Sequence, residues 1–341
     1  MLVFAGAGAM VCAAVGTALL RTRAQAWGLM DVPNERSLHT RVTPRGGGVV
    51  VVLTVLGGLL GVAFGHGVPP VRAAAYAAGA VLVAGIGWRD DLRSVTPGRR
   101  LLTHLLAAAV AVGVWGTFHA LAAPGAGEWR IPAGLAVCAT VLWLVGLVNA
   151  YNFMDGIDGL AAGQAVIAGL TWSVLCGSAA PLVTAAATFV AGASLGFLWH
   201  NWSPARIFMG DAGSGFLGFS FAVFPLMAFD ATGDARLPVA GALIVAPFLF
   251  DTVFTLARRL KRRENVVEAH RSHLYQRLVT SGRSHAAVSL LYLGLATASG
   301  AAAVSWVRGM SGWILLLPVA AICSLPLVVS ASERSGGAAD G

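Results

Sequence analysis

The sequence predicts an all-α, multi-pass membrane protein, and three observations support this fold class. Hydrophobic residues make up 57% of the 341 residues. Charged residues make up only 11%, against roughly a quarter in an average soluble domain. The apolar residues gather in runs of about 20, the length at which a helix crosses the hydrocarbon core of a bilayer. Such runs are expected to be helical, because backbone polar groups in lipid must be satisfied within the segment.

Eleven segments are predicted to span the membrane. A count of ten, without the first or the last segment, would leave the inner loops unchanged. Residues 1–331 are expected to form one integral membrane domain, and residues 332–341 a disordered tail. The predicted spans are 3–20, 48–66, 71–88, 101–123, 131–149, 160–177, 181–199, 214–230, 237–256, 285–307 and 312–331.

The positive charges of the loops predict the orientation. Nineteen of the 23 Lys and Arg residues fall on alternate loops and the C-terminal tail, and only four on the opposite side. By the positive-inside rule, the N-terminus is expected outside and the C-terminus in the cytoplasm. The net charge of +8 fits this bias and contact with anionic lipid, so no nucleic-acid partner is expected. The loops predicted to be cytoplasmic and catalytic are 21–47, 88–100, 149–160, 200–214 and 257–284.

One of these loops carries polar residues at a regular spacing. Asn149, Asn152, Asp155 and Asp158 recur every three residues between two apolar runs. On a regular α-helix, steps of three drift by about 60° each, so the first and last would diverge. On a broken turn with three residues per turn, all four align. The spacing therefore predicts a convergent polar site at the membrane surface, and an ordinary capped helix end is the alternative.

Two adjacent carboxylates, Asp90 and Asp91, lie in the second inner loop. An unpaired Asp-Asp at a membrane face is unfavourable unless a cation is present. Arg89 and Arg93 are one source of positive charge. The other is Mg²⁺ with a phosphorylated substrate, because Mg²⁺ binds through one or two carboxylates plus substrate phosphates.

The first inner loop combines cations with glycines. Arg45 precedes the run Gly46-Gly47-Gly48, a combination that suits phosphate binding through guanidinium groups and backbone N–H groups. A basic loop that only sets topology is the alternative.

The fourth inner loop contains Asn201, Phe208, Asp211 and Ser214. Ser214 is expected to cap the next helix, with free N–H groups near Asp211. Phe208 is available either to stack on a base or to pack into the bilayer interface.

The last inner loop is strongly basic and contains His270, Arg271 and His273. Two histidines three residues apart can bind Zn²⁺, but with an arginine between them they are better suited to contacting a diphosphate. Asp251 lies within a predicted span, where a carboxylate is a functional candidate. Its expected partner is Arg258 or Arg259.

Taken together, these motifs resemble those of the polyprenyl-phosphate N-acetylhexosamine-1-phosphate transferases. That family includes the phospho-MurNAc-pentapeptide translocase and the enzymes that start O-antigen and teichoic acid synthesis. The resemblance covers nearly the whole chain. Its signatures are Asp90-Asp91, Asn149-x-x-Asn152-Phe-x-Asp155-Gly-x-Asp158-Gly-Leu-Ala, Asn201-x(6)-Phe208-Met-Gly-Asp211-x-Gly-Ser and the His loop near the C-terminus.

The resemblance implies a Mg²⁺-dependent reaction, with Mn²⁺ as the alternative cofactor, at the cytoplasmic face of the bacterial inner membrane. A sugar-1-phosphate would pass from a UDP-activated amino sugar to undecaprenyl phosphate, releasing UMP. Asp90, Asp91 and Asp211 would be catalytic, with Asp211 and Asp90 at the metal. The residues implied to bind nucleotide or substrate are Asn149, Asn152, Asp155, Asp158, Asn201, Phe208, Arg45, His270, Arg271 and His273.

Several alternatives stay open at this level. The form of the His loop favours UDP-GlcNAc or a 6-deoxy relative over UDP-MurNAc-pentapeptide as donor. Direct attack by the lipid phosphate, with Asp90 orienting it or taking a residual proton, competes with an aspartyl intermediate. A lipid-linked sugar transporter is the rival from another class, although transporters place ionisable groups near the bilayer centre. A homodimer is also open.

Overall fold

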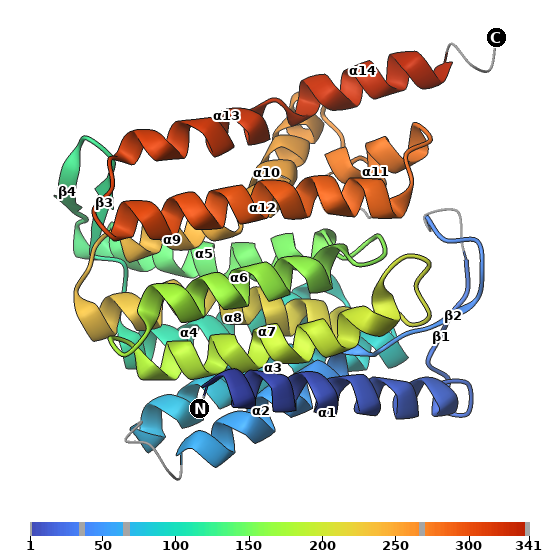
Figure 1. Ribbon diagram of the computed structural model, residues 1–341, viewed down its shortest axis with the longest axis horizontal. Coiled ribbons are helices and arrows are strands. Elements are labelled where there is room, and N and C mark those ends of the chain that lie inside the picture. The colour runs from blue at the N-terminus through green and yellow to red at the C-terminus, as the bar shows by residue number, and fades with distance from the viewer. Residues whose placement is uncertain (1, 34–37, 64–68, 266–269, 338–341) are drawn as a thin grey trace.

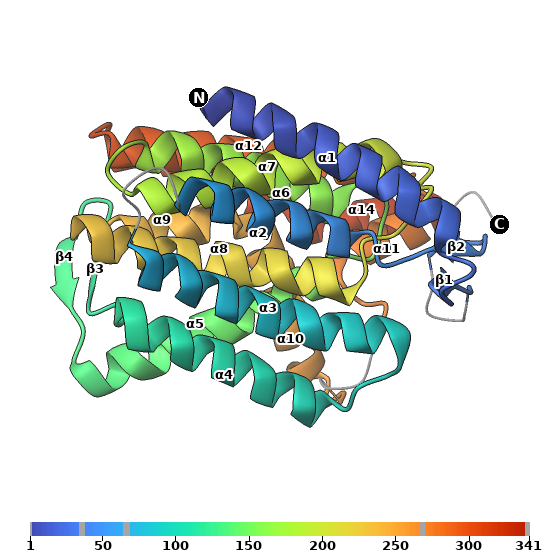
Figure 2. The same cartoon turned by 90° about the horizontal axis from the view of Figure 1, so that it is seen from below.

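The computed structural model describes residues 2–33, 38–63, 69–265 and 270–337, and it is a bundle of helices lying side by side (Figures 1 and 2). The fold class predicted from the sequence is confirmed, because helices account for nearly all of the regular structure. The long helices are α1 (Leu2–Arg23), α2 (Gly48–Ala63), α3 (Pro70–Leu92), α4 (Pro97–Trp115), α5 (Ala133–Phe153), α6 (Leu160–Cys176), α7 (Pro181–Asn201), α8 (Asp211–Thr232), α10 (Ala246–Lys261) and α12 (His285–Val307). The shorter elements are α9 (Leu237–Ile244), α11 (Leu274–Thr280), the 3₁₀ turn η1 (Gly312–Leu315), α13 (Leu316–Cys323) and α14 (Leu325–Gly337).

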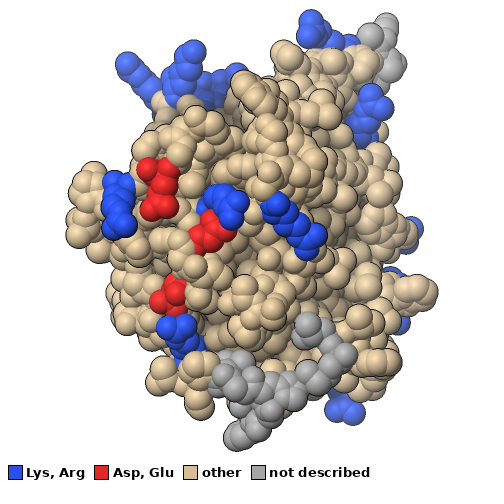
Figure 3. All heavy atoms as spheres, turned by 60° about the vertical axis from the view of Figure 1, so that its left-hand side comes forward, with Lys and Arg blue, Asp and Glu red and all other residues tan. Residues whose placement is uncertain are grey.

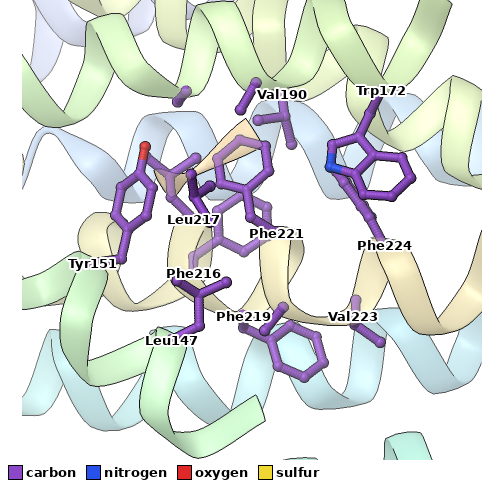
Figure 4. Packing of buried hydrophobic residues seen from close by; sticks show 14 of the residues in the cluster. Leu147, Tyr151, Trp172, Val190, Phe216, Leu217, Phe219, Phe221, Val223 and Phe224 are labelled. Atoms are coloured by element: carbon purple, nitrogen blue, oxygen red, sulfur yellow. The ribbon is translucent and has the colours of Figure 1, made fainter. Parts of the chain in front are cut away.

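Helix α8 is the centre of the bundle. Its apolar stretch is entirely buried, and it packs along α3 and α5. In Figure 4, Phe221 of α8 lies between Tyr151 of α5 and Trp172 of α6. The Tyr151 and Phe221 ring centroids are 5.6 Å apart, and those of Trp172 and Phe224 are 6.3 Å apart. Aromatic side chains thus hold α8 rigidly, and its first residue, Asp211, is placed with it.

The two ends of the bundle differ (Figures 1 and 2). One end, called here the loop end, carries α11 and the short strands β1 (Met30–Asp31) and β2 (Thr43–Pro44). The opposite end carries the hairpin of β3 (Ala120–Ala123) and β4 (Gly127–Arg130). Every loop that the sequence predicts to be catalytic contributes to the loop end.

The hairpin end carries scattered charges of both signs, and in Figure 3 red and blue side chains lie next to each other there. Two ion pairs account for part of this pattern, Arg72 with Asp230 at 2.8 Å and Arg236 with Asp234 at 2.8 Å. Charges that neutralise each other in pairs leave this end without a concentrated patch of one sign.

The number of membrane crossings stays a prediction. Within the described residues, seven helices are long and apolar enough to cross a bilayer, or eight if α9 and α10 form one bent span. Helices α2 and α6 are shorter apolar helices, and α4 coincides with a further predicted span. Each of the eleven predicted segments thus contains helix, while the orientation of the termini also stays a prediction.

Three predicted segments differ clearly in shape or extent from the helices of the structure. The fourth segment ends at Trp115 rather than at residue 123, because Gly116 adopts a φ of 75° and the hairpin follows. The ninth segment is two helices bent by 76°, with Pro247 in the first turn of the second, where its missing N–H is tolerated. Helix α14 continues to Gly337, so residues 332–337 of the expected disordered tail are helical.

Candidate active site

A cavity of about 230 Å³ opens among the loops at the loop end of the bundle. Aspartates from four separate segments line it, together with an arginine and an aromatic ring. It is called the acidic cavity here. Its lining residues are Asp31, Leu38, His39, Arg45, Asp91, Asp155, Gly156, Ile157, Asp158, Asn201, Phe208, Met209, Gly210, Asp211, Gln276 and His285.

Asp91 joins α3 to the start of α8. Its two carboxylate oxygens accept hydrogen bonds from the backbone N–H groups of Asp211 at 2.9 Å and Ala212 at 3.1 Å. An anion at a helix N-terminus satisfies donors that have no partner within the helix. Asp91, rather than Ser214, therefore caps α8, and Ser214 lies inside the helix. A side chain at Gly210 would collide with the Asp91 carboxylate.

Arg100, at the start of α4, links the two other acidic residues. Its guanidinium group lies 2.9 Å from Asp90 and 3.1 Å from Asp211, and it also donates to Asn152 at 3.0 Å. Asn152 in turn donates to Asp211 at 3.0 Å and to Ser214 at 2.9 Å. Asp90 is held by Arg100 and by the N–H of Val95, and it does not line the acidic cavity.

Arg45 and Phe208 are placed by backbone pairing between two loops. Phe208 donates its N–H to Pro44 at 2.8 Å, and Gly47 donates to Phe208 at 3.0 Å. Arg45 donates to the carbonyl of Asp91 through one terminal nitrogen, while its buried Nε has no hydrogen-bond partner among the described residues. Arg45 therefore lines the acidic cavity and carries one buried donor without a partner among the described residues.

Two of the three glycines expected to bind phosphate use their N–H groups within the fold. The N–H groups of Gly47 and Gly48 donate to Phe208 and Met209 instead. A Cβ atom at Gly48 would lie 2.3 Å from Gly213 Cα, and one at Gly47 would lie 2.4 Å from Phe197. These glycines allow the first loop to approach the start of α8 closely.

The carboxyls of the loop after α5 differ in charge state. Burial, followed by repulsion from Asp211 and Asp91, raises the pKa of Asp155 well above its usual range. Burial also acts to raise the pKa of Asp158, but hydrogen bonds from His285 and the N–H of Ala205 outweigh it and lower that pKa. Asp155 is thus a proton-binding group in the acidic cavity, whereas Asp158 is a fixed anion.

The four polar residues spaced by three do not align as one row. Helix α5 continues through Phe153, so Asn149 lies on a regular helix and faces away from the acidic cavity. Its amide nitrogen contacts the ring of His104 at 3.3 Å and the Val145 carbonyl at 2.8 Å. Asn201 lines the acidic cavity, but its side chain accepts from the Gly159 N–H at 3.1 Å and donates to Ile207 at 3.0 Å. Both amides hold backbone and neighbouring side chains in place.

Asp251 organises the His loop. Its carboxylate is fully buried and accepts from His273 Nδ1 at 3.1 Å and from the Tyr292 hydroxyl at 2.6 Å. It also accepts from the backbone N–H groups of Leu274 at 2.8 Å and Tyr275 at 3.0 Å. The expected pairing with Arg258 or Arg259 is therefore wrong, because the bend between α9 and α10 turns Asp251 toward α11.

The remaining predicted residues of the His loop lie outside the lining of the acidic cavity. His270 stacks on His273 with ring centroids 5.1 Å apart. Burial, then the charges of His273 and Arg259, lower the pKa of His270 to about 4, so its ring is neutral at pH 7. Arg271 is exposed.

Five polar residues at or beside the acidic cavity were not predicted as site residues: Asp31, His39, Arg100, Gln276 and His285. His39 packs edge-on against Phe208 with ring centroids 4.8 Å apart, and its Nε2 is buried without a partner among the described residues. His285 lies 3.3 Å from Asp158. No local sequence pattern indicated these residues, because the contacts of Arg100 with Asp211, of His39 with Phe208 and of His285 with Asp158 join positions far apart in sequence.

The donor set of the acidic cavity fits Mg²⁺. Within the described residues, no three His, Cys, Asp or Glu side chains are grouped as a ready-made metal site. Mg²⁺ does not require such a cage, because it binds through one or two carboxylates and completes its shell with water and phosphate oxygens. Asp211 and Asp155 both face the cavity and supply hard oxygen ligands.

A bundle of apolar helices, with carboxylates, an arginine and an aromatic ring gathered around a cavity at one end, defines a multi-pass membrane protein with a polar site. The model of glycosyl transferase family 4 matches residues 73–229. The chain belongs to this family. The matched segment contains Asp90, Asp91, Asp155 and Asp211, and therefore most of the acidic residues described above.

Curated relatives are similar over most of the chain. One is the "Probable undecaprenyl-phosphate N-acetylglucosaminyl 1-phosphate transferase" of Bacillus subtilis, 33% identical over 269 residues, covering 78% of this chain and 74% of the relative. Another is the decaprenyl-phosphate N-acetylglucosaminephosphotransferase of Mycobacterium tuberculosis, 29% identical over 344 residues, covering 89% and 82%. The phospho-N-acetylmuramoyl-pentapeptide-transferase of Heliobacterium modesticaldum is 38% identical over 154 residues, covering 45% and 46%.

Proposed function

We propose that this protein transfers N-acetylglucosamine-1-phosphate from UDP-N-acetylglucosamine to a polyprenyl phosphate and releases UMP. The observation that carries the proposal is the acidic cavity, into which separate segments bring Arg45, Asp155, Phe208 and Asp211 together. The relatives with the broadest coverage are named for N-acetylglucosamine transfer to a polyprenyl phosphate. The relative named for a pentapeptide substrate matches less than half of the chain, which favours N-acetylglucosamine as the sugar.

The reaction exchanges one phosphoanhydride bond for another. An oxygen of the lipid phosphate attacks the sugar-bearing phosphorus, and the bond to the UMP oxygen breaks. A phosphate monoester has its second pKa near 6, so the acceptor is largely dianionic at pH 7. It therefore needs orientation and charge neutralisation more than a strong general base. Asp90 is occupied by Arg100, which favours orientation of the acceptor by cationic groups over proton removal by Asp90.

The residues of the acidic cavity divide the remaining tasks. Phe208 offers a ring face for the uracil, with His39 packed against its edge. Arg45 lines the cavity and would supply positive charge to a phosphate oxygen. Asp211 would hold Mg²⁺, with Asp155 nearby, and the ion would neutralise the charge of the diphosphate. Mn²⁺ offers the same chemistry. The positive charge of the basic loops supports the cytoplasmic face of a bacterial inner membrane as the side on which this reaction occurs.

The reaction is tested with the purified protein, Mg²⁺, undecaprenyl phosphate and a panel of UDP-sugars. We expect UMP release with UDP-N-acetylglucosamine, lower release with its 6-deoxy relatives and none with UDP-MurNAc-pentapeptide. If no donor in the panel gives UMP, the enzyme assignment is wrong and the transporter alternative is favoured. The same assay without acceptor should leave no labelled phosphosugar on the protein, since trapped label would indicate an aspartyl intermediate.

The Asp155 carboxyl predicts a coupling between pH and Mg²⁺. The pKa of Asp155 is raised in the folded protein. The protonated carboxyl therefore contributes its full stability below about pH 4, the pKa in the unfolded chain. This contribution is lost as the pH rises through the pKa of the folded protein. A divalent cation at Asp211 would relieve this loss by lowering the Asp155 pKa. We therefore expect Mg²⁺ to raise the unfolding temperature more at pH 8 than at pH 5.5.

Thermal unfolding in neutral detergent measures this coupling directly, without a need for turnover. Asp155→Asn should reduce the pH dependence, with and without Mg²⁺, because the neutral amide does not titrate, while the carboxyls of Asp91 and Asp211 remain in the same cavity. An equal response to Mg²⁺ at both pH values in the unmodified protein would show that Asp155 is not coupled to the cation.

A further inference from the structure

A second cavity of about 460 Å³ lies between α11, α12 and α14. It is called the α12–α14 groove here, and it shares no lining residue with the acidic cavity. Its lining residues are Leu278, Arg283, Ala287, Val288, Leu291, Val328, Ala331, Ser332 and Ser335.

The α12–α14 groove is polar at one end and apolar at the other. Helix α12 starts at the loop end of the bundle and α14 finishes there (Figure 1). Arg283, Ser332 and Ser335 therefore lie at the loop end, whereas Leu291 and Val328 lie further along the helices, toward the membrane interior. Leu291 is 37% exposed and Val328 is 43% exposed. A lipid of the bilayer leaflet next to the loop end has the same arrangement, with its polar headgroup at the membrane surface and its acyl chains toward the interior.

The polar end carries positive charge without a carboxylate to balance it. Arg283 is exposed and contacts Ser332 Oγ through Nε at 3.3 Å, and no ion pair to it is present among the described residues. Glu333, the acid next to Ser332, is instead held by two hydrogen bonds from Arg277, at 2.8 and 2.7 Å. The N-terminus of α12, capped by Ser284, adds partial positive charge beside Arg283.

We propose that the α12–α14 groove binds one anionic phospholipid of the surrounding bilayer. Its phosphate would lie against Arg283, and an acyl chain would cover Leu291 and Val328. A membrane is the source of such a ligand at this site, because the apolar end of the groove opens where the helices face lipid.

The polyprenyl phosphate acceptor fits this groove less well. Helix α11 and the first turn of α12 form a wall between the two cavities. Gln276 and His285 face the acidic cavity, whereas Leu278 and Ala287 face the groove. A phosphate at Arg283 is therefore behind this wall rather than in line with Asp211.

A bound phospholipid would act on the transferase site through α11. The first residue of this helix, Leu274, and the preceding His273 are bonded to Asp251. Leu278, one turn further on, forms part of the groove. A lipid in the groove would contact α11 on one side while Asp251 holds its first residue on the other. It would thereby restrict the movement of α11 and of Gln276, which lines the acidic cavity. We expect an anionic phospholipid to raise the unfolding temperature of the protein.

Binding is measured on the full chain in neutral detergent by native mass spectrometry, with phosphatidylglycerol and phosphatidylcholine as probes. Phosphatidylglycerol should be retained in preference to phosphatidylcholine. Arg283→Gln should weaken its binding about tenfold, the effect of losing one charged hydrogen bond. Arg334→Gln is the matched control, because Arg334 of α14 is likewise an exposed arginine but donates to the Ser330 carbonyl of its own helix. If both variants lose the same amount of phosphatidylglycerol binding, the effect is general charge attraction and the proposed site is wrong.

A second pair of variants tests the apolar end while keeping every charge. Leu291→Trp should fill the groove and abolish retention of phosphatidylglycerol, whereas Leu290→Trp, at a neighbouring exposed position outside the groove, should leave it intact. Each variant must keep the unfolding temperature of the unmodified protein without added lipid. Displacement of phosphatidylglycerol by equimolar undecaprenyl phosphate would assign the groove to the acceptor and overturn the phospholipid proposal. None of these measurements requires transferase activity, so they test the phospholipid site independently of the proposed reaction.

Discussion

Replacement of Asp211 by asparagine is expected to reduce kcat by about 1,000-fold, the size of effect seen when a charge-stabilising group is removed from an active site. Asp211 is the first residue of the buried helix α8 and faces the acidic cavity. Its carboxylate accepts from Asn152 at 3.0 Å and pairs with Arg100 at 3.1 Å. Asparagine keeps the shape and one acceptor oxygen but removes the negative charge that would hold Mg²⁺.

The fold should tolerate this change. The Asp211 side chain is 32% exposed, so the lost ion pair is solvent-screened and contributes under about 1 kcal/mol. Asp234→Asn is the matched control at the hairpin end, where the carboxylate pairs with Arg236. The measurement is UMP release at saturating donor, together with thermal unfolding of both variants. Activity in Asp211→Asn equal to that of Asp234→Asn would remove Asp211 from the catalytic assignment.

Replacement of Asp251 by asparagine is expected to lower both stability and activity, although Asp251 does not line the acidic cavity. The carboxylate accepts five hydrogen bonds, the fifth from Thr255 at 3.2 Å. An amide has only one acceptor oxygen, and its NH₂ group would face donors that have lost their partner. Leaving buried donors unpaired next to a former charge costs about 3 kcal/mol.

The effect on activity follows from the contacts of Tyr275. Its N–H is held by Asp251, and its hydroxyl donates to the carbonyl of Phe153 at 2.9 Å. A Cβ atom at Gly156 would lie 2.1 Å from the same hydroxyl. Asp251 thus positions the loop that carries Asp155, and its replacement should raise the donor KM and lower kcat at least tenfold, by misplacing that loop.

Tyr292→Phe is the graded control for Asp251. It removes a single donor at 2.6 Å and leaves the other four bonds in place, so activity should stay within about twofold and the stability loss near 1 kcal/mol. Unfolding temperature and steady-state kinetics distinguish the two variants. If Asp251→Asn behaves like Tyr292→Phe, the carboxylate is a local structural partner and does not position the site.

The membrane fold and much of the acidic cavity were predictable from residue types. Apolar runs of the right length predict helices, and the structure contains helix in every predicted span. Arg45, Asp155, Phe208 and Asp211 were all predicted and all line one cavity. They were recognisable because charged, glycine-flanked segments between apolar runs stand out in a membrane protein.

The direction of each side chain was not predictable from the same pattern. Asn149 turns toward His104 because α5 stays helical past it, and Asp90 turns toward Arg100 because α3 continues through Leu92. Helices that are apolar on every face carry no periodic signal of which side meets a neighbour. The direction in which the side chains of the last helical turn of α3 and α5 point therefore depends on how these helices pack.

The sequence by itself determined that this chain is a helical membrane protein whose acidic and basic loop residues gather into a site. Composition and span length suffice for that, because lipid leaves helices as the way to satisfy the backbone. Only the tertiary structure decided which residues meet: Asp91 on the N-terminus of α8, Asp251 beneath the His loop, and His39, Gln276 and His285 at the acidic cavity. These contacts join residues far apart in sequence, and the bend between α9 and α10 and the close packing at the glycines bring them together.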